Sequence, residues 1–193
     1  MRKKINYCQC LRRETAIQIF RKSPLTIESQ TYFLWVVALC LLSLISALML
    51  EYIGGYPPCS FCIYERWPYV IAFVASLLGI FTKRPPIDIG AMFICMVAFF
   101  IGTALSLYHV GMEHHWFPMP KACTGGDLSS ALSFDELKTL VLKRKIVPCD
   151  QVPIRFLGFS LVEYNLVFSF ILFICSFRLT LKFFQKWQIQ KSK

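Results

Sequence analysis

Long runs of apolar residues alternate with short polar segments along this chain. Four runs approach the length of about 20 residues that a transmembrane helix needs. They cover residues 31–50, 61–82, 89–108 and 164–181. The last run is interrupted only by Arg178 near its end, where a long side chain can reach the membrane surface. The pattern therefore predicts an all-α membrane protein, a four-transmembrane-helix bundle.

The polar segments divide the chain around one membrane domain, residues 31–181. Residues 1–30 form a basic N-terminal segment and residues 182–193 a basic tail. The first apolar run is too long for the core of a signal peptide, so we interpret it as a retained helix. The segments between helices are expected to be a short loop at 51–60, a tight turn after residue 82 and a long loop at 109–163.

The long loop has a helical pattern of its own. Ser133 and Glu136 match a capping box, in which the two side chains bond the free N–H groups at a helix start. Apolar residues then recur at helical spacing, at Phe134, Leu137, Leu140 and Val141. We expect a short amphipathic helix that lies on the membrane surface.

Composition and charge agree with a membrane protein and give it an orientation. Of the 193 residues, 56% are hydrophobic, and the mean hydropathy is +0.54. Fourteen of the 21 Lys and Arg residues fall on the side of the two termini. The positive-inside rule then places both termini in the cytoplasm and the loops at 51–60 and 109–163 outside, in a bacterium the periplasm. Lipid-facing charge accounts for the net charge of +10 without nucleic acid.

The nine cysteines fall into three groups. Three lie within predicted spans, where cysteine behaves as a small hydrophobe: Cys40, Cys95 and Cys175. Two lie in the cytoplasmic segment and are interpreted as inert thiols: Cys8 and Cys10. Four lie on the oxidising side, an even number, as two disulfides require: Cys59, Cys62, Cys123 and Cys149.

Cys59 and Cys62 are at the predicted start of the second span. A spacing of three residues puts both sulfurs on one helix face, where the helix dipole favours a thiolate. Arg66 is four residues after Cys62 and shares that face. Its permanent charge can stabilise a thiolate or the oxygen of an electron acceptor. The alternative is a structural disulfide, with Glu65 and Arg66 as an ordinary interfacial pair.

Cys123 and Cys149 are 26 residues apart in the long loop. A disulfide between them would be stabilising because it closes a long loop, and a purely structural role is one interpretation. A redox role needs an exposed Cys123, and Gly125-Gly126 beside it suits attack by a partner thiol. A zinc site built from all four outer cysteines competes with both interpretations. We expect no metal, because the second pair is widely split and the compartment is oxidising.

Several of these motifs together resemble the DsbB family, disulfide bond formation protein B. The most specific is Cys59-Ser-Phe-Cys62-Ile-Tyr-Glu-Arg66, followed by Tyr108-His109 at the end of the third span. The Cys123/Cys149 pair and Phe156-Leu157-Gly158 before the fourth span also match. The resemblance extends from about residue 30 to 180. The longer N-terminal segment, Arg178, His114 and His115 depart from the family pattern.

The resemblance implies an enzyme of the bacterial inner membrane, a thiol:quinone oxidoreductase. It would reoxidise a periplasmic DsbA-like protein of the thioredoxin fold. Cys123 would accept the partner's cysteine with Cys149 as its pair, and electrons would pass through Cys59 and Cys62. The resemblance further implies a membrane quinone, ubiquinone or menaquinone, as acceptor beside Cys62. The quinone site would include Arg66, His109 and Glu65.

Two other functions compete with this expectation. One is a DsbB variant dedicated to a single client. The other is a non-enzymatic membrane protein with two structural disulfides, whose outer cysteines stay paired when a reduced DsbA-like protein is added.

Overall fold

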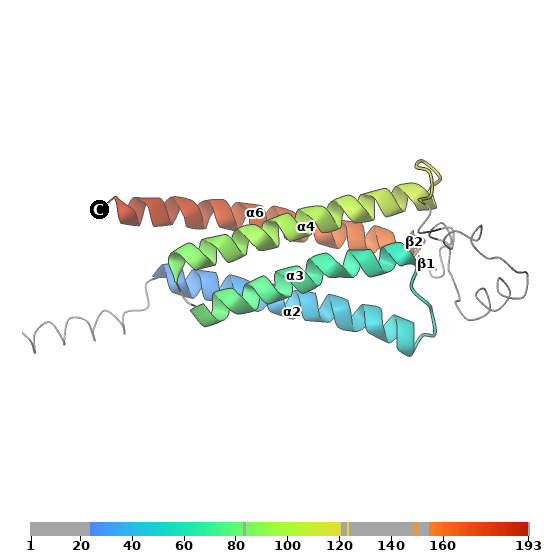
Figure 1. Cartoon of the computed structure of the whole chain (residues 1–193), viewed down its shortest axis with the longest axis horizontal. Coiled ribbons are helices and arrows are strands. Elements are labelled where there is room, and N and C mark those ends of the chain that lie inside the picture. Colours follow the sequence, from blue (N-terminus) through green and yellow to red (C-terminus); the bar gives the residue numbers. More distant parts are fainter. Residues whose placement is uncertain (1–23, 83, 121–122, 124–148, 150–154, 193) are drawn as a thin grey trace, which may run out of the picture.

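The described part of the chain forms a bundle of four long helices with a short hairpin at one end (Figure 1). The computed structural model describes residues 24–82, 84–120, 123, 149 and 155–192. The helices are α2 (Pro24–Tyr52), α3 (Ser60–Thr82), α4 (Pro85–Glu113) and α6 (Leu161–Lys191). All four are long and apolar enough to cross a membrane, so the expected fold class is confirmed.

Each predicted span lies inside one of these helices, but α2, α4 and α6 are longer than expected. α4 continues to Glu113, so His109, at the predicted start of the long loop, lies within a helix. α2 begins at Pro24, and α6 continues to Lys191, through residues that the sequence suggested as a basic lead and tail. An ion pair between Lys186 and Glu28 joins the two extensions. A helix need not end at the membrane surface, because its backbone groups stay paired while charged side chains extend into water.

The hairpin precedes α6 and sets where that helix starts. Strands β1 (Arg155–Phe156) and β2 (Phe159–Ser160) pair antiparallel, with Arg155 opposite Ser160. Gly158 in the turn has φ 90°, a conformation that glycine adopts without strain. Ser160 then caps α6, since its hydroxyl accepts from the Glu163 N–H while its own N–H donates to Glu163 Oε2.

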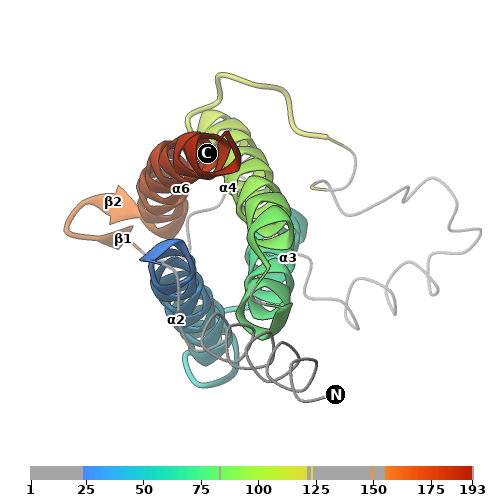
Figure 2. The same cartoon turned by 90° about the vertical axis from the view of Figure 1, so that its left-hand side faces the viewer.

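The helices surround a common core when the bundle is viewed along its length (Figure 2). α4 packs along both α3 and α6, whereas α2 packs mainly on α3 and contacts α6 little. Phe33 of α2 is fully buried against Gly79 of α3. A Cβ added to Gly79 would lie 2.3 Å from a ring carbon of Phe33, so only glycine permits this approach of the two helices.

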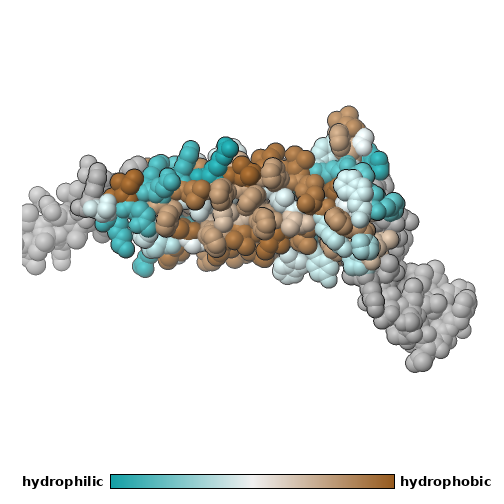
Figure 3. Space-filling model, turned by 90° about the horizontal axis from the view of Figure 1, so that it is seen from above, coloured by the Kyte–Doolittle hydropathy of each residue, from teal (hydrophilic) through white to brown (hydrophobic). Residues whose placement is uncertain are grey.

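The outer face of the bundle is apolar over most of its length (Figure 3). Large apolar side chains are exposed there from every helix, among them Leu34, Val74, Phe100 and Phe170. In the core, Cys40 and Cys95 are fully buried with apolar neighbours, as the sequence suggested, whereas Cys175 is exposed. An exposed apolar belt around a helical bundle fits contact with lipid.

Some expected features lie outside the described residues. They are Cys8 and Cys10 in the basic N-terminal segment, the amphipathic helix that begins at Ser133, and Gly125-Gly126.

Candidate functional site

The dithiol motif lies at the start of α3, at the end of the bundle opposite the C-terminus of α6 (Figure 1). Cys59 directly precedes α3, and Cys62 lies in its first turn. The two are free thiols with sulfurs 2.7 Å apart, and the Cys62 N–H donates to Cys59 Sγ at 3.2 Å. The hydrogen bond from the Cys62 thiol lowers the pKa of Cys59, which outweighs the opposing effect of burial. The lowered pKa makes the Cys59 thiolate, the form that attacks disulfides, easier to form than that of an ordinary thiol.

The second cysteine pair lies against the first. Cys123 and Cys149 form a disulfide with a Cα–Cα distance of 5.4 Å. Both are 1% exposed and share one buried cluster with Cys59 and Met112, against which Cys62 packs. The structure thus brings together all four cysteines that the sequence singled out. Cys123 is buried in this state, so attack by a partner would require the loop to move.

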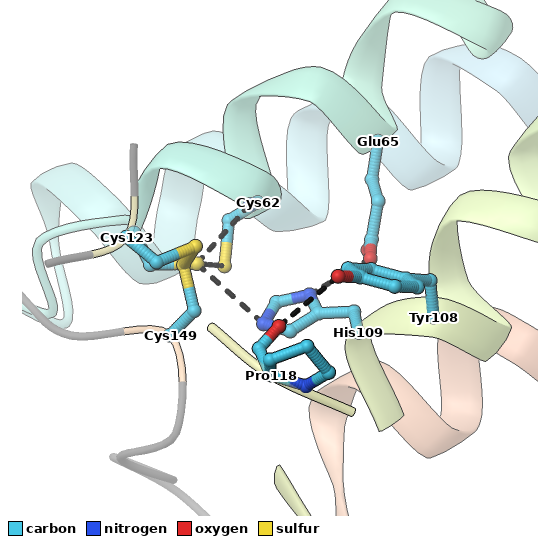
Figure 4. The surroundings of a disulfide bond; sticks show 8 residues. Cys62, Glu65, Tyr108, His109, Pro118, Cys123 and Cys149 are labelled. Carbon is cyan, nitrogen blue, oxygen red and sulfur yellow. Dashed lines mark hydrogen bonds and ion pairs between the residues drawn. A yellow bond between two sulfur atoms is a disulfide. The ribbon is translucent and has the colours of Figure 1, made fainter. Parts of the chain in front are cut away.

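Aromatic residues hold the start of the long loop over this cluster. The Tyr108 ring stacks between Phe61 and Phe117, with centroids 5.6 and 5.3 Å away. The Tyr108 hydroxyl donates to the Pro118 carbonyl at 3.1 Å (Figure 4). Phe117 in turn lies against Gly111, where any side chain would collide with its ring. Met119 packs against the same cluster, so the residues that follow α4 lie beside the cysteines.

His109 lies between the dithiol and a buried carboxylate. Its Nε2 is 3.7 Å from Cys59 Sγ, and its Nδ1 is 2.8 Å from Glu65 Oε1. The side chains of His109 and Glu65 are 2% and 8% exposed. Because the carboxylate accepts the Nδ1 proton, the Nε2 lone pair or proton is directed at the sulfurs. From the sequence we expected His109 and Glu65 near a quinone, but we did not expect them to contact each other.

A second layer of polar side chains supports this carboxylate. Asn165 of α6 donates to Glu65 Oε2 and to Ser106, both at 2.8 Å. The Tyr69 hydroxyl donates to Asn165 Oδ1 at 2.6 Å and contacts Ser169 at 2.7 Å. Asn165 and Tyr69 were missed at the sequence level. An amide within an apolar span was the available signal, because unsatisfied polar groups are costly in a membrane.

Arg66 and Glu65 do not pair, contrary to the interfacial alternative. Arg66 Nη1 instead binds Glu51 Oε2 at the end of α2, at 2.6 Å. Each of these side chains is 23% exposed. The pair connects α2 to α3 and leaves the guanidinium beside the dithiol.

A cavity of about 370 Å³ lies next to the dithiol, among all four helices. Its walls from α2 and α6 are mainly apolar, and include Leu42, Leu50, Leu161 and Phe168. Five residues singled out from the sequence line it: Cys59, Cys62, Glu65, Arg66 and His109. Cys123 and Cys149 do not. The dithiol thus borders the loop disulfide on one side and an apolar cavity on the other.

A further polar group, the carboxylate of Glu113, lines the cavity. Glu113 accepts from the Ser160 hydroxyl at 2.6 Å. His114 binds Glu163 Oε1 at 3.1 Å and stacks on Trp116. His115 has φ 59° in the turn after α4. His114 and His115 are therefore placed at the end of α4 and do not line the cavity.

The four apolar helices and the clustered cysteines define a multi-pass membrane protein in which a free dithiol lies next to a disulfide. These are the groups that thiol–disulfide exchange requires. Comparison with known proteins agrees. The family model for disulfide bond formation protein DsbB matches residues 29–179, and the chain belongs to that family. Its members form disulfides.

Individual relatives are distant. Disulfide bond formation protein B of Histophilus somni is 28% identical over 160 residues, which cover 82% of this chain and 86% of that protein. The protein of the same name from Pasteurella multocida is 28% identical over 131 residues, covering 63% and 72%. An uncharacterised Rickettsia prowazekii protein, RP370, is 27% identical over 139 residues, covering 72% and 80%.

Proposed function

We propose that this protein is a thiol:quinone oxidoreductase that reoxidises a DsbA-like protein. One observation carries the proposal: the Cys59–Cys62 pair lies in or against the buried cluster that holds the Cys123–Cys149 disulfide, and it also lines an apolar cavity with charged groups. Electrons can therefore enter the dithiol from one side and leave on the other. A structural disulfide pair has no need of such a cavity.

The thiol half of the reaction is two balanced exchanges. A thiolate of the partner attacks Cys123, Cys149 leaves, and the partner's second thiol resolves the mixed disulfide. The reduced loop pair then transfers its two electrons to a Cys59–Cys62 disulfide by the same exchange. Of the two cysteines at the start of α3, Cys59 is the one that belongs to the buried cluster with the loop disulfide. We therefore assign Cys59 the exchange with the loop cysteines.

The cavity suits a quinone as the electron acceptor. Its volume falls in the range of small-molecule sites, about 300–1,000 Å³. A bound quinone accepts two electrons and two protons. Arg66 supplies fixed positive charge, while His109 and Glu113 can hold protons at the cavity wall. The apolar sides from α2 and α6 can accommodate a hydrocarbon tail.

The proposed setting is a bacterial inner membrane with both termini in the cytoplasm. The support is the excess of Lys and Arg near the termini. The start of α2 and the end of α6 lie at one end of the bundle, and the start of α3, which carries Cys59 and Cys62, lies at the other (Figure 1). The cysteines would then face the periplasm, where a DsbA-like partner works.

Turnover of purified protein in lipid nanodiscs tests the proposal. With a reduced DsbA-like donor and ubiquinone or menaquinone, the parent should reduce quinone and oxidise the donor. Cys59→Ala or Cys62→Ala should abolish quinone reduction. Cys123→Ala should block donor oxidation while quinone still oxidises the remaining dithiol. Cys175→Ala, at an exposed cysteine far from the cluster, serves as the matched control. No turnover by the parent, with the outer cysteines still paired, would favour two structural disulfides.

A further inference from the structure

Two sulfur atoms and one imidazole nitrogen meet beside the cavity. The sulfurs of Cys59 and Cys62 and a ring nitrogen of His109 all lie within 4.8 Å of one another. Thiolate and imidazole are the ligands that Zn²⁺ takes most often in proteins. We propose that this trio binds Zn²⁺ when the dithiol is reduced and that the bound ion stops electron transfer.

The distances are close to those of a tetrahedral zinc site. Bond lengths of about 2.3 Å to sulfur and 2.0 Å to nitrogen put neighbouring ligand atoms about 3.5–3.8 Å apart. Cys59 Sγ and His109 Nε2 are already 3.7 Å apart. The two sulfurs are 2.7 Å apart and must separate by about 1 Å. Cys62 is only partly buried, so rotation of its side chain can supply this movement.

His109 is held as a zinc ligand would be. Glu65 Oε1 accepts from Nδ1 at 2.8 Å, which leaves the Nε2 lone pair directed at the sulfurs. A carboxylate behind a ligating histidine is a common second partner of zinc sites. Asn165 holds the other oxygen of the same carboxylate at 2.8 Å. All three ligand residues line the cavity, which leaves room for a water molecule as the fourth ligand.

This ligand set differs from the four-cysteine zinc site considered from the sequence. Cys123 and Cys149 form a disulfide and have no thiolate to offer. Only reduction of the Cys59–Cys62 pair creates the site, so metal binding depends on redox state. Binding releases the thiol protons and moves no electrons. The inhibition rests on the proposed function, because zinc would occupy the sulfurs that must pass electrons on.

Zinc titration of the reduced full-length protein tests the site. A Cys8→Ala, Cys10→Ala, Cys123→Ala, Cys149→Ala, Cys175→Ala background removes the competing thiols and leaves, besides Cys59 and Cys62, only the buried Cys40 and Cys95. We expect one Zn²⁺ per chain after reduction and none after oxidation of Cys59–Cys62. X-ray absorption at the zinc edge should show two sulfur ligands and one imidazole. Weak, redox-independent binding, or a site without imidazole, would overturn the proposal.

Variants separate the ligands from their surroundings. His109→Ala should weaken zinc binding at least tenfold, and Glu65→Gln by about 10- to 100-fold. His114→Ala, at an exposed histidine of the same helix end, should bind zinc like the parent. If His109→Ala fails to fold, Glu65→Gln and the absorption spectrum still decide the question. Unchanged affinity in Glu65→Gln, with no imidazole in the spectrum, would contradict the site.

Turnover of the parent distinguishes this inference from the proposed function. Zn²⁺ should slow quinone reduction, and a chelator should restore it. Turnover with chelator but no zinc binding would overturn the zinc site and leave the oxidoreductase standing. Zinc binding without turnover in chelator would overturn the oxidoreductase and, with it, the inhibitory role.

Discussion

The contact between Arg66 and an electron acceptor is the part of the proposed reaction that one substitution tests most directly. Arg66 Nη1 lies 2.6 Å from Glu51 Oε2 and lines the cavity beside Cys62. A guanidinium has five N–H donors, so the Glu51 contact leaves donors for an acceptor oxygen. Arg66→His removes the permanent charge and most of those donors.

The expected size of the effect follows from that contact. A hydrogen bond to a charged group contributes about 1.5–3 kcal/mol. Since about 1.4 kcal/mol is a factor of ten, its loss corresponds to about 10- to 150-fold in binding. The Arg66 side chain is 23% exposed, and water competes for it, which favours the lower end. We expect the quinone KM of Arg66→His to rise about tenfold.

Initial rates of quinone reduction at varied quinone concentration give this KM. Stopped-flow exchange with the reduced DsbA-like donor, without quinone, reports the thiol step and should change less. Arg155→His is the matched control, because Arg155 is exposed on β1 and does not line the cavity. Glu51→Gln keeps the guanidinium and should leave KM unchanged or lower. An unchanged KM in Arg66→His, or an equal loss in the thiol step, would refute the assigned role.

Three further predictions concern packing, protonation and the buried polar network. Gly79→Ala should lower the free energy of unfolding in detergent by about 1–3 kcal/mol, because the added methyl group collides with Phe33. Gly90→Ala is the control and should leave this free energy unchanged, because the space around Gly90 is open. In the reduced protein, Cys59 alkylation followed by mass spectrometry should show a midpoint pH below that of an ordinary thiol. The lowered pKa of Cys59 should also make the reduced protein more stable as pH rises towards that ordinary value, and less stable as pH falls through the lowered one. Asn165→Leu should slow quinone reduction and cost about 2–4 kcal/mol, since it leaves buried partners unsatisfied; an unchanged melting temperature would contradict this.

Local sequence was enough for the helices and for the motif that begins α3. An apolar run of membrane length forms a helix wherever it occurs, because lipid offers no other partner for its backbone groups. The capping-box pattern is also local, yet from the sequence we recognised it only at Ser133 and Glu136. The same pattern at Ser160 and Glu163 is the one that the described structure uses to start α6.

The partners of the charged groups were decided only by the tertiary structure. From the sequence, Glu65 and Arg66 are neighbours, and a pair between them was a reasonable alternative. In the bundle, adjacent helix positions point about 100° apart, so Glu65 faces α4 and α6 while Arg66 faces α2. Their partners come from positions 15 to 100 residues away, which no local pattern specifies.

The amino-acid sequence by itself determined the membrane class, the four helices and the cysteines that carry the chemistry, since these depend on hydropathy and on short spacings. Only the tertiary structure decided that the loop disulfide lies against Cys59, that His109 connects this sulfur to Glu65, and that a cavity opens beside Cys62. The physical reason is that helix packing, which depends on close contacts such as Gly79 with Phe33, sets which distant side chains can meet.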